Sequence, residues 1–121
     1  MTTEHDPINH PKHYAAIPAD VECIDIARHL PYNLGCAFKY VWRAGEKDIT
    51  ATNEDLDKAV WYINDYMEHF GKVPYKSVAA LAVWETVRKR DNEERAYALD
   101  CILIGDYLRA ITAIQMMKKV V

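Results

Sequence analysis

Residues 34–45 have the sequence LGCAFKYVWRAG, and this stretch decides the fold class. Asn33 precedes it, and asparagine is one of the residues that cap helix N-termini. Gly45 ends it, and glycine readily adopts the left-handed conformation that closes a helix. The apolar residues between these two signals fit one helix, so we expect a helix over 34–44 with Asn33 as its cap.

Caps and helix breakers predict further helices on both sides of this stretch. Asp20 precedes a segment with helical apolar spacing that Pro31 ends, and residues 52–55 resemble a capping box before a segment that Gly71 ends. All five prolines lie in the first 74 residues, so Gly105 is the one helix-breaking residue in the rest of the chain. The expected helices are 21–30, 34–44, 54–70, 75–89 and 93–119.

The expected fold is therefore all-α, a small bundle of about five helices in a single domain over residues 1–121. Residues 1–18 are polar and rich in proline, which biases the preceding residues toward extended conformations, so they form an extended N-terminal arm. Residues 19–71 form the helical core, and residues 72–121 form a C-terminal helical hairpin. Because the last helix is apolar on more than one side, we expect this hairpin to pair with a second copy in a homo-oligomer.

Composition argues against several classes of protein. The chain has no run of 18 apolar residues and no basic start followed by an apolar segment, so we expect no membrane span, no secretory signal and a cytoplasmic location. Cys23, Cys36 and Cys101 are odd in number and widely spaced, which favours reduced, buried thiols over disulfides or a zinc site. Residues 1–71 hold six Lys or Arg against twelve Asp or Glu, which disfavours nucleic-acid binding.

Two sets of charged residues are candidates for chemistry. Lys39, Arg43 and Lys47 follow at four-residue steps, and an ammonium and a guanidinium on one helix face can hold a phosphate group together. The sequence has no glycine-rich phosphate loop, so side-chain cations would have to do this work. The pairs Glu22–Asp25 and Glu54–Asp57 each share a helix face, and their carboxylates are candidate ligands for Mg²⁺.

Two further groups of polar residues accompany them. His13 and Tyr14 lie in the arm, where an imidazole and a phenol can stack on a base or donate to a phosphate. Asp55, Lys58 and Tyr62 belong to a polar strip along the expected helix 54–70, in which Asp55 and Lys58 have the spacing of an intrahelical ion pair.

The order and spacing of four motifs resemble the SaV-like family of small phage proteins. The family patterns are PxHY, ExID, GNxxKYxxRxxxK and DLxKAxxY. Here they correspond to Pro11–Tyr14, Glu22–Asp25, Gly35–Lys47 and Asp55–Tyr62, and the resemblance extends over about residues 8–70. Cys36 departs from the pattern, since the family usually has Asn at that position.

A related segment occurs in the nucleotide kinase of T-odd coliphages, which phosphorylates deoxynucleoside monophosphates without a glycine-rich phosphate loop. The resemblance therefore implies a phage-encoded, nucleotide-handling protein of the host cytoplasm, most concretely a kinase-like phosphotransferase. It implies that Lys39 and Arg43 hold phosphates with support from Lys47 and Lys58, and that His13, Tyr14 and Tyr62 contact the nucleotide. Glu22, Asp25 or Asp55 would hold Mg²⁺ or orient a hydroxyl or water.

Two alternatives stay open. The first is a non-catalytic protein that sequesters a nucleotide signal or binds a host defence protein through its C-terminal helices. The second is a Mg²⁺-dependent nucleoside triphosphate pyrophosphohydrolase similar to the MazG type, with Glu22, Asp25, Glu54 and Asp57 as its metal ligands.

Overall fold

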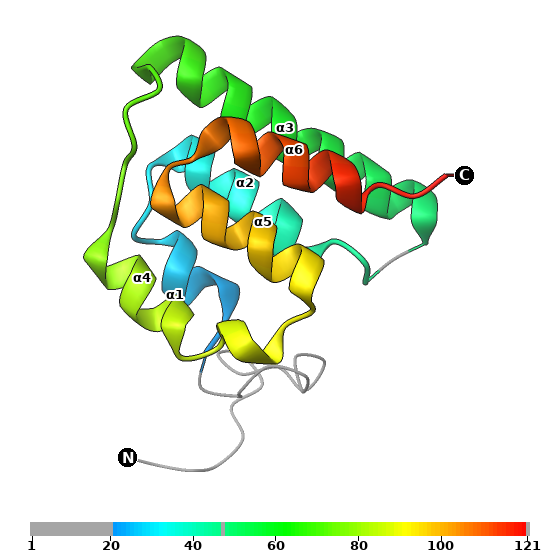
Figure 1. The fold of residues 1–121 in the computed structure, drawn as a ribbon, viewed down its shortest axis with the longest axis horizontal. Coiled ribbons are helices and arrows are strands. Elements are labelled where there is room, and N and C mark those ends of the chain that lie inside the picture. Colours follow the sequence, from blue (N-terminus) through cyan, green and yellow to red (C-terminus); the bar gives the residue numbers. More distant parts are fainter. Residues whose placement is uncertain (1–20, 47, 121) are drawn as a thin grey trace.

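The computed structural model describes residues 21–46 and 48–120, and within them the fold is all-helical (Figure 1). Six α-helices and one short 3-10 helix make up this part of the chain. They are α1 (Cys23–Ala27), α2 (Tyr32–Arg43), α3 (Ile49–Phe70), α4 (Val78–Glu85), the 3-10 helix Arg88–Arg90, α5 (Glu93–Ile104) and α6 (Tyr107–Met117). The all-α prediction is confirmed, and the expected arm over 1–18 and its neighbour Asp20 lie outside the described residues.

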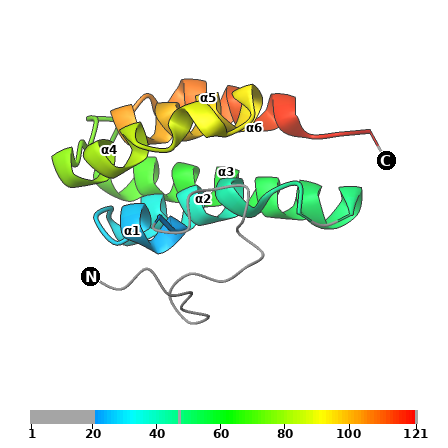
Figure 2. The ribbon, with the colours of Figure 1, turned by 90° about the horizontal axis from the view of Figure 1, so that it is seen from below.

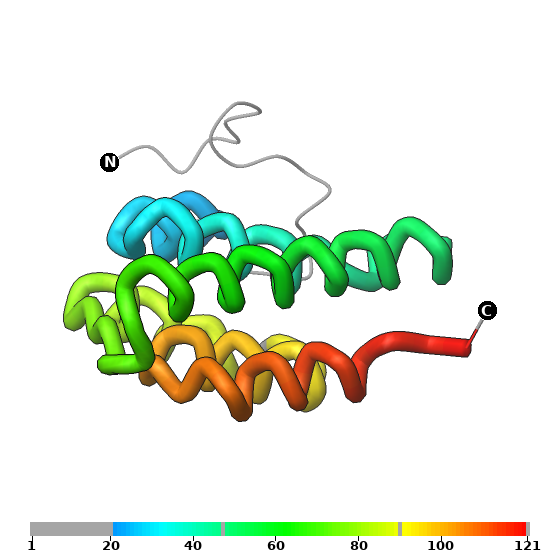
Figure 3. Tube along the Cα trace, turned by 90° about the horizontal axis from the view of Figure 1, so that it is seen from above, coloured from blue at the N-terminus to red at the C-terminus, as the bar shows by residue number. Residues whose placement is uncertain are grey.

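The helices form two layers, which Figures 2 and 3 show from opposite sides. One layer contains α1, α2 and α3, and the other contains α4, α5 and α6. Each helix of the first layer packs on one helix of the second, in the pairs α1 with α4, α2 with α5 and α3 with α6. Within the layers, the main contacts join α2 to α3 and α5 to α6.

The core lies between these layers and is aromatic at one end. Phe38, Trp42 and Trp84 are buried there, with the Phe38 and Trp84 rings edge to face at a centroid distance of 6.0 Å. The Trp84 indole nitrogen donates to a carboxylate oxygen of Asp100 at 2.6 Å, and Arg88 also pairs with Asp100. Ring packing thus joins the second layer to the first, and the contacts with Asp100 join α4 and the 3-10 helix to α5 within the second layer.

Two of the expected helix starts are wrong. Helix α2 begins at Tyr32 after Pro31, so Asn33 lies inside the helix and its amide donates to Asp65 of α3 at 2.6 Å instead of capping. Helix α3 begins at Ile49 because the Asp48 carboxylate accepts from the backbone N–H of Ala51 at 2.8 Å. The ends are correct, since Gly45 and Gly71 both have positive φ angles.

The other expected helices are shorter or divided in the structure. The expected helix 21–30 is reduced to the five residues of α1, and 75–89 to α4 and the 3-10 helix. A single helix over 93–119 does not form, because Gly105 adopts a left-handed conformation with φ 78° and Asp106 caps a new helix. The C-terminal hairpin is therefore α5 with α6. Folding back on itself accounts for apolar residues on several sides of this segment, and the predicted homo-oligomer stays a prediction.

Substitution of Gly105 should destabilise the protein through two effects. A Cβ atom at this position would lie 2.4 Å from the Cβ of Pro74, and the left-handed backbone costs a non-glycine residue roughly 1–2 kcal/mol by itself. We expect Gly105→Ala to lower the free energy of unfolding, measured by urea denaturation, by about 3 kcal/mol. Gly45→Ala is the matched control, since Gly45 has φ 95° and a Cβ atom there would meet nothing within 4 Å, so it should show the backbone cost alone. Equal losses in both variants would contradict the close contact with Pro74.

The C-terminal end of α6 is attached to the start of α3. The Asn53 amide donates to the Lys119 carbonyl at 2.8 Å and accepts from the Lys119 N–H at 3.1 Å. The Lys118 ammonium lies 2.6 Å from Asp57.

None of the helices in residues 21–46 and 48–120 combines the length and apolar character needed to cross a bilayer.

Candidate functional site

The polar strip of α3 faces α2. Asp55 lies 3.5 Å from the Arg43 Nε atom, and Asp65 accepts from Asn33 near the other end of the strip. Between these contacts, the Tyr62 ring stacks on the Tyr40 ring at a centroid distance of 6.0 Å and an interplanar angle of 14°. The α2–α3 seam therefore brings together residues that lie far apart in the sequence.

Three cations surround the Tyr40 ring in this seam. The Nζ atoms of Lys39 and Lys58 lie 4.8 and 5.4 Å from the ring centroid, and the Arg43 guanidinium carbon lies at 5.9 Å. These separations are within the range of cation–π attraction. We call Lys39, Tyr40, Arg43, Lys58 and Tyr62 the cation–tyrosine cluster.

Most of the positive charge of this cluster is not neutralised by the described chain. Arg43 has Asp55 as its partner, whereas no carboxylate of residues 21–46 and 48–120 lies within 4.0 Å of the Lys39 or Lys58 ammonium. The predicted ion pair between Asp55 and Lys58 does not form there, because Asp55 points to α2. Two exposed ammonium groups and a guanidinium beside one ring form a site suited to a dianion.

Asp55 is the buried carboxylate of this site. Asp55 is 3% exposed, and its Oδ2 atom has no hydrogen-bond partner in the described part of the chain. A buried carboxylate oxygen without a hydrogen bond is costly, and the nearby Arg43 charge offsets only part of that cost. The Arg43 guanidinium is thus the charged group that faces this oxygen in the described part of the chain.

The structure brings together only part of the predicted nucleotide site. Lys39, Arg43, Lys58 and Tyr62, which the resemblance implies as nucleotide contacts, lie together around Tyr40, while His13, Tyr14 and Lys47 lie outside the described residues. The central ring, that of Tyr40, is not among the predicted site residues. Its position directly after Lys39 and three residues before Arg43 is the signal that would have identified it.

The predicted Mg²⁺ ligands do not form one ligand set within the described residues. Asp25 accepts from the Glu22 backbone N–H at 2.8 Å, as in a capping box, and lies 3.5 Å from Arg28. Asp57 is bound to Lys118, and Glu54 is exposed near the start of α3. No three of the four carboxylates Glu22, Asp25, Glu54 and Asp57 lie close enough together in the structure described to share an ion. Because Mg²⁺ commonly takes only one or two carboxylates together with phosphate oxygens, its binding by these residues stays a prediction.

One other group of possible metal ligands lies at the end of α3. Asp65, Glu68 and His69 place one ligand atom each within 4.8 Å of one another. The His69 ring is 2.9 Å from the Asp65 carbonyl oxygen, and this hydrogen bond and the Asp65 carboxylate raise the pKa of His69 above its usual value. The group is mostly exposed, and its contacts are those of an ordinary helix end.

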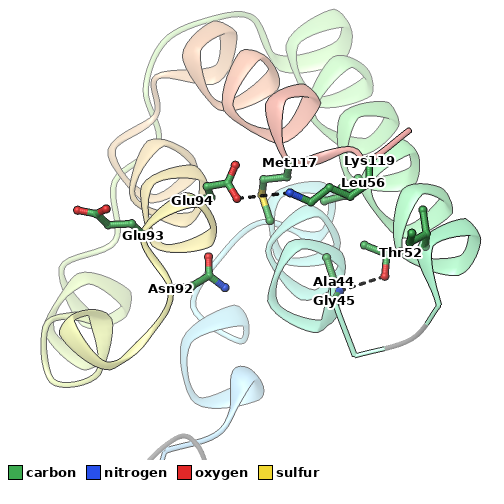
Figure 4. Close-up of a pocket in the computed structure, with 10 residues that line it drawn as sticks. Ala44, Gly45, Thr52, Leu56, Asn92, Glu93, Glu94, Met117 and Lys119 are labelled. Atoms are coloured by element: carbon green, nitrogen blue, oxygen red, sulfur yellow. Dashed lines mark hydrogen bonds and ion pairs between the residues drawn. The ribbon is translucent and has the colours of Figure 1, made fainter. Parts of the chain in front are cut away.

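A pocket of about 510 Å³ lies between the ends of four helices (Figure 4). Lys119 approaches Glu94 at 3.9 Å on one side, and the Gly45 N–H donates to the Thr52 hydroxyl at 3.2 Å on the other. Among the described residues that line it, none belongs to the predicted phosphate or metal site.

A family model for proteins of unknown function, DUF3310, matches residues 8–64. The matched segment contains α1, α2 and the first sixteen residues of α3, and with them the whole cation–tyrosine cluster. No curated protein and no solved structure matches the chain. Helices α4, α5 and α6 lie outside the similarity.

Proposed function

We propose that this protein binds nucleotides, with the phosphate group held at the cation–tyrosine cluster. The observation that carries the proposal is the arrangement of Lys39, Arg43 and Lys58 around the Tyr40 ring, with two of the three cations lacking a carboxylate partner in the described chain. Cations on helix surfaces are commonly only solvated, but three of them from two helices converging on one ring favour a bound anion.

The ligand class follows from the aromatic part of the cluster. The stacked rings of Tyr40 and Tyr62 give the phosphate site an apolar aromatic border, which suits a phosphate ester that carries a ring better than inorganic phosphate. The motifs that resemble the SaV-like family include Lys39, Arg43, Lys58 and Tyr62, and this resemblance favours a nucleotide over other esters.

Removal of either cation should strongly weaken nucleotide binding. We expect Lys39→Ala and Arg43→Ala each to weaken the binding of the preferred nucleotide by about 30-fold or more, because a charge-assisted contact contributes roughly 2 kcal/mol. Isothermal titration calorimetry against nucleoside mono-, di-, tri- and cyclic phosphates, with and without Mg²⁺, measures this effect. Lys72→Ala is the matched control, since Lys72 is an exposed lysine outside the cluster. Unchanged affinity in both cluster variants, with helical content intact by circular dichroism, would overturn the proposal.

A second candidate, kinase-like phosphoryl transfer to a nucleoside monophosphate, is favoured by the buried Asp55 oxygen. Phosphoryl transfer depends mainly on positioning and charge neutralisation, and in this proposal the carboxylate next to Arg43 orients an acceptor hydroxyl or takes its proton. We expect ADP to form from ATP only when a monophosphate acceptor is present. Asp55→Asn, which keeps the size of the side chain, should lower this rate by about 100-fold or more while nucleotide affinity changes less.

The same assay separates the alternatives. Release of pyrophosphate from a triphosphate, without ADP, would replace the kinase by a pyrophosphohydrolase. Tight binding of a mononucleotide or cyclic nucleotide without any turnover would favour a sequestering protein. Either result contradicts the kinase and leaves nucleotide binding at the cluster in place.

A further inference from the structure

A second pocket lies between α1 and α2, next to the cation–tyrosine cluster. Its volume is about 550 Å³, which is within the usual range for small-molecule sites. Ile24, Ala27 and Leu30 give it an apolar wall. Gly35 also lines it, where α2 approaches α1 so closely that a Cβ atom would lie 3.2 Å from the Ala27 carbonyl oxygen.

The pocket and the cluster share residues. Lys39 lines the pocket and also contributes its ammonium to the Tyr40 ring. Tyr32 lines the pocket too, and its ring meets the Tyr62 ring edge to face at 6.2 Å, so an aromatic surface continues from the pocket to the stacked rings of the cluster. A ligand in the pocket can therefore place an anionic end at Lys39 without leaving the apolar wall.

The polar groups of the pocket suit an uncharged ring and sugar. Glu22 supplies a carboxylate that can accept from ring N–H or sugar O–H groups, and the neighbouring Cys36 thiol raises the pKa of Tyr32. The Glu22 carboxylate disfavours a second phosphate at this point, since like charges repel, and the Arg28 guanidinium, which also lines the pocket, already pairs with Asp25 at 3.5 Å. The phosphate thus belongs at the cluster and the rest of the ligand in the pocket.

We propose that the α1–α2 pocket binds the nucleoside part of the nucleotide whose phosphate the cation–tyrosine cluster holds. This inference rests on the proposed function and adds to it a second subsite. It makes the ligand a nucleoside phosphate that spans from α1 to the α2–α3 seam, with Lys39 at the junction of the two subsites.

The test compares a nucleotide with inorganic pyrophosphate on the full chain. Ile24 is 52% exposed, so Ile24→Ser removes part of the apolar wall without disturbing the core. We expect this variant to bind the preferred nucleoside monophosphate about tenfold more weakly and pyrophosphate as tightly as the original protein. Val78→Ser, a change at an exposed apolar residue of α4, is the matched control and should alter neither affinity.

Alkylation of Cys36 gives an independent measurement. The Cys36 thiol is half-buried and lines the pocket, so a bound nucleoside should slow its reaction with N-ethylmaleimide, followed by site-resolved mass spectrometry, by about fivefold or more. Pyrophosphate should leave the rate unchanged.

The outcomes separate the subsite from the proposed function. In one outcome, Ile24→Ser binds the nucleotide normally, the nucleotide does not slow Cys36 alkylation, and Lys39→Ala still weakens nucleotide binding. The nucleoside part then lies elsewhere, and only the proposed subsite is wrong. If no nucleotide binds to the original protein, the proposed function fails and the subsite with it.

Discussion

Trp84→Ala should lower the free energy of unfolding by about 3–5 kcal/mol, the usual loss for a large aromatic residue truncated in a core. Trp84 is 1% exposed and packs against Phe38 and Trp42, at ring centroid distances of 6.0 and 6.4 Å. The substitution also removes the donor to Asp100. Because domains of this size are stable by roughly 5–15 kcal/mol, this loss is a large part of the total.

Guanidinium chloride denaturation measures the effect of Trp84→Ala, with two comparison variants on the same helix. Trp84→Phe keeps a ring and loses the hydrogen bond, so we expect a loss of about 1–2 kcal/mol. Val78→Ala changes a residue that is 83% exposed and should stay within about 0.5 kcal/mol of the original protein. A Trp84→Ala loss no larger than that of Val78→Ala would show that α4 does not pack against the first layer as described.

Arg95→Ala should be comparably destabilising, for an electrostatic reason. The Arg95 side chain donates from Nε to both carboxylate oxygens of Asp91, at 2.8 and 2.9 Å, and from Nη1 to the Trp42 carbonyl at 2.8 Å. The two charged side chains are 16% and 7% exposed. Removal of one partner of a pair this buried leaves an unpaired carboxylate and typically costs about 3–5 kcal/mol.

Thermal and chemical denaturation of the Arg95 variants should show where this energy comes from. In the double variant Arg95→Met with Asp91→Leu, no charge is left unpaired, so stability should partly recover. Arg109→Ala is the matched control, because Arg109 pairs with Asp106 at 3.6 Å in an exposed position and should lose less than about 1 kcal/mol. If the double variant is as unstable as Arg95→Ala, the main contribution comes instead from the Trp42 carbonyl at the end of α2.

Much of the helical architecture can be predicted from local sequence signals. The ends of α2 and α3 follow from Gly45 and Gly71, and the start of α5 follows from Asn92, whose side chain accepts from the Arg95 backbone N–H. These signals act within one turn of helix and need no tertiary contact. The break at Gly105 is harder to predict, because glycine is tolerated inside helices, and the close approach of Pro74 that excludes a Cβ atom at this position is a tertiary contact.

In the candidate site, too, local features can be predicted from the sequence and tertiary contacts cannot. The spacing of Lys39 and Arg43 places them on one helix face, which the sequence states directly. The pairing of Arg43 with Asp55 depends on how α2 and α3 align across the seam, and the arrangement of Lys58 and Tyr62 around Tyr40 depends on the same alignment. Local propensity contains no information on that alignment, so the strip on α3 is predicted as a set of polar residues but not as the second half of a site.

The two-layer arrangement makes the segment that matches DUF3310 dependent on the rest of the chain. The similarity to DUF3310 ends within α3. The matched segment therefore includes most of the layer that carries the cation–tyrosine cluster, and it includes no residue of the second layer, α4, α5 and α6. The apolar faces of α2 and α3 are buried against α5 and α6, and they would be open to water without them. The matched segment is therefore not a self-sufficient folding unit in this protein: removal of α5 and α6 should expose its apolar faces and cause it to aggregate or unfold.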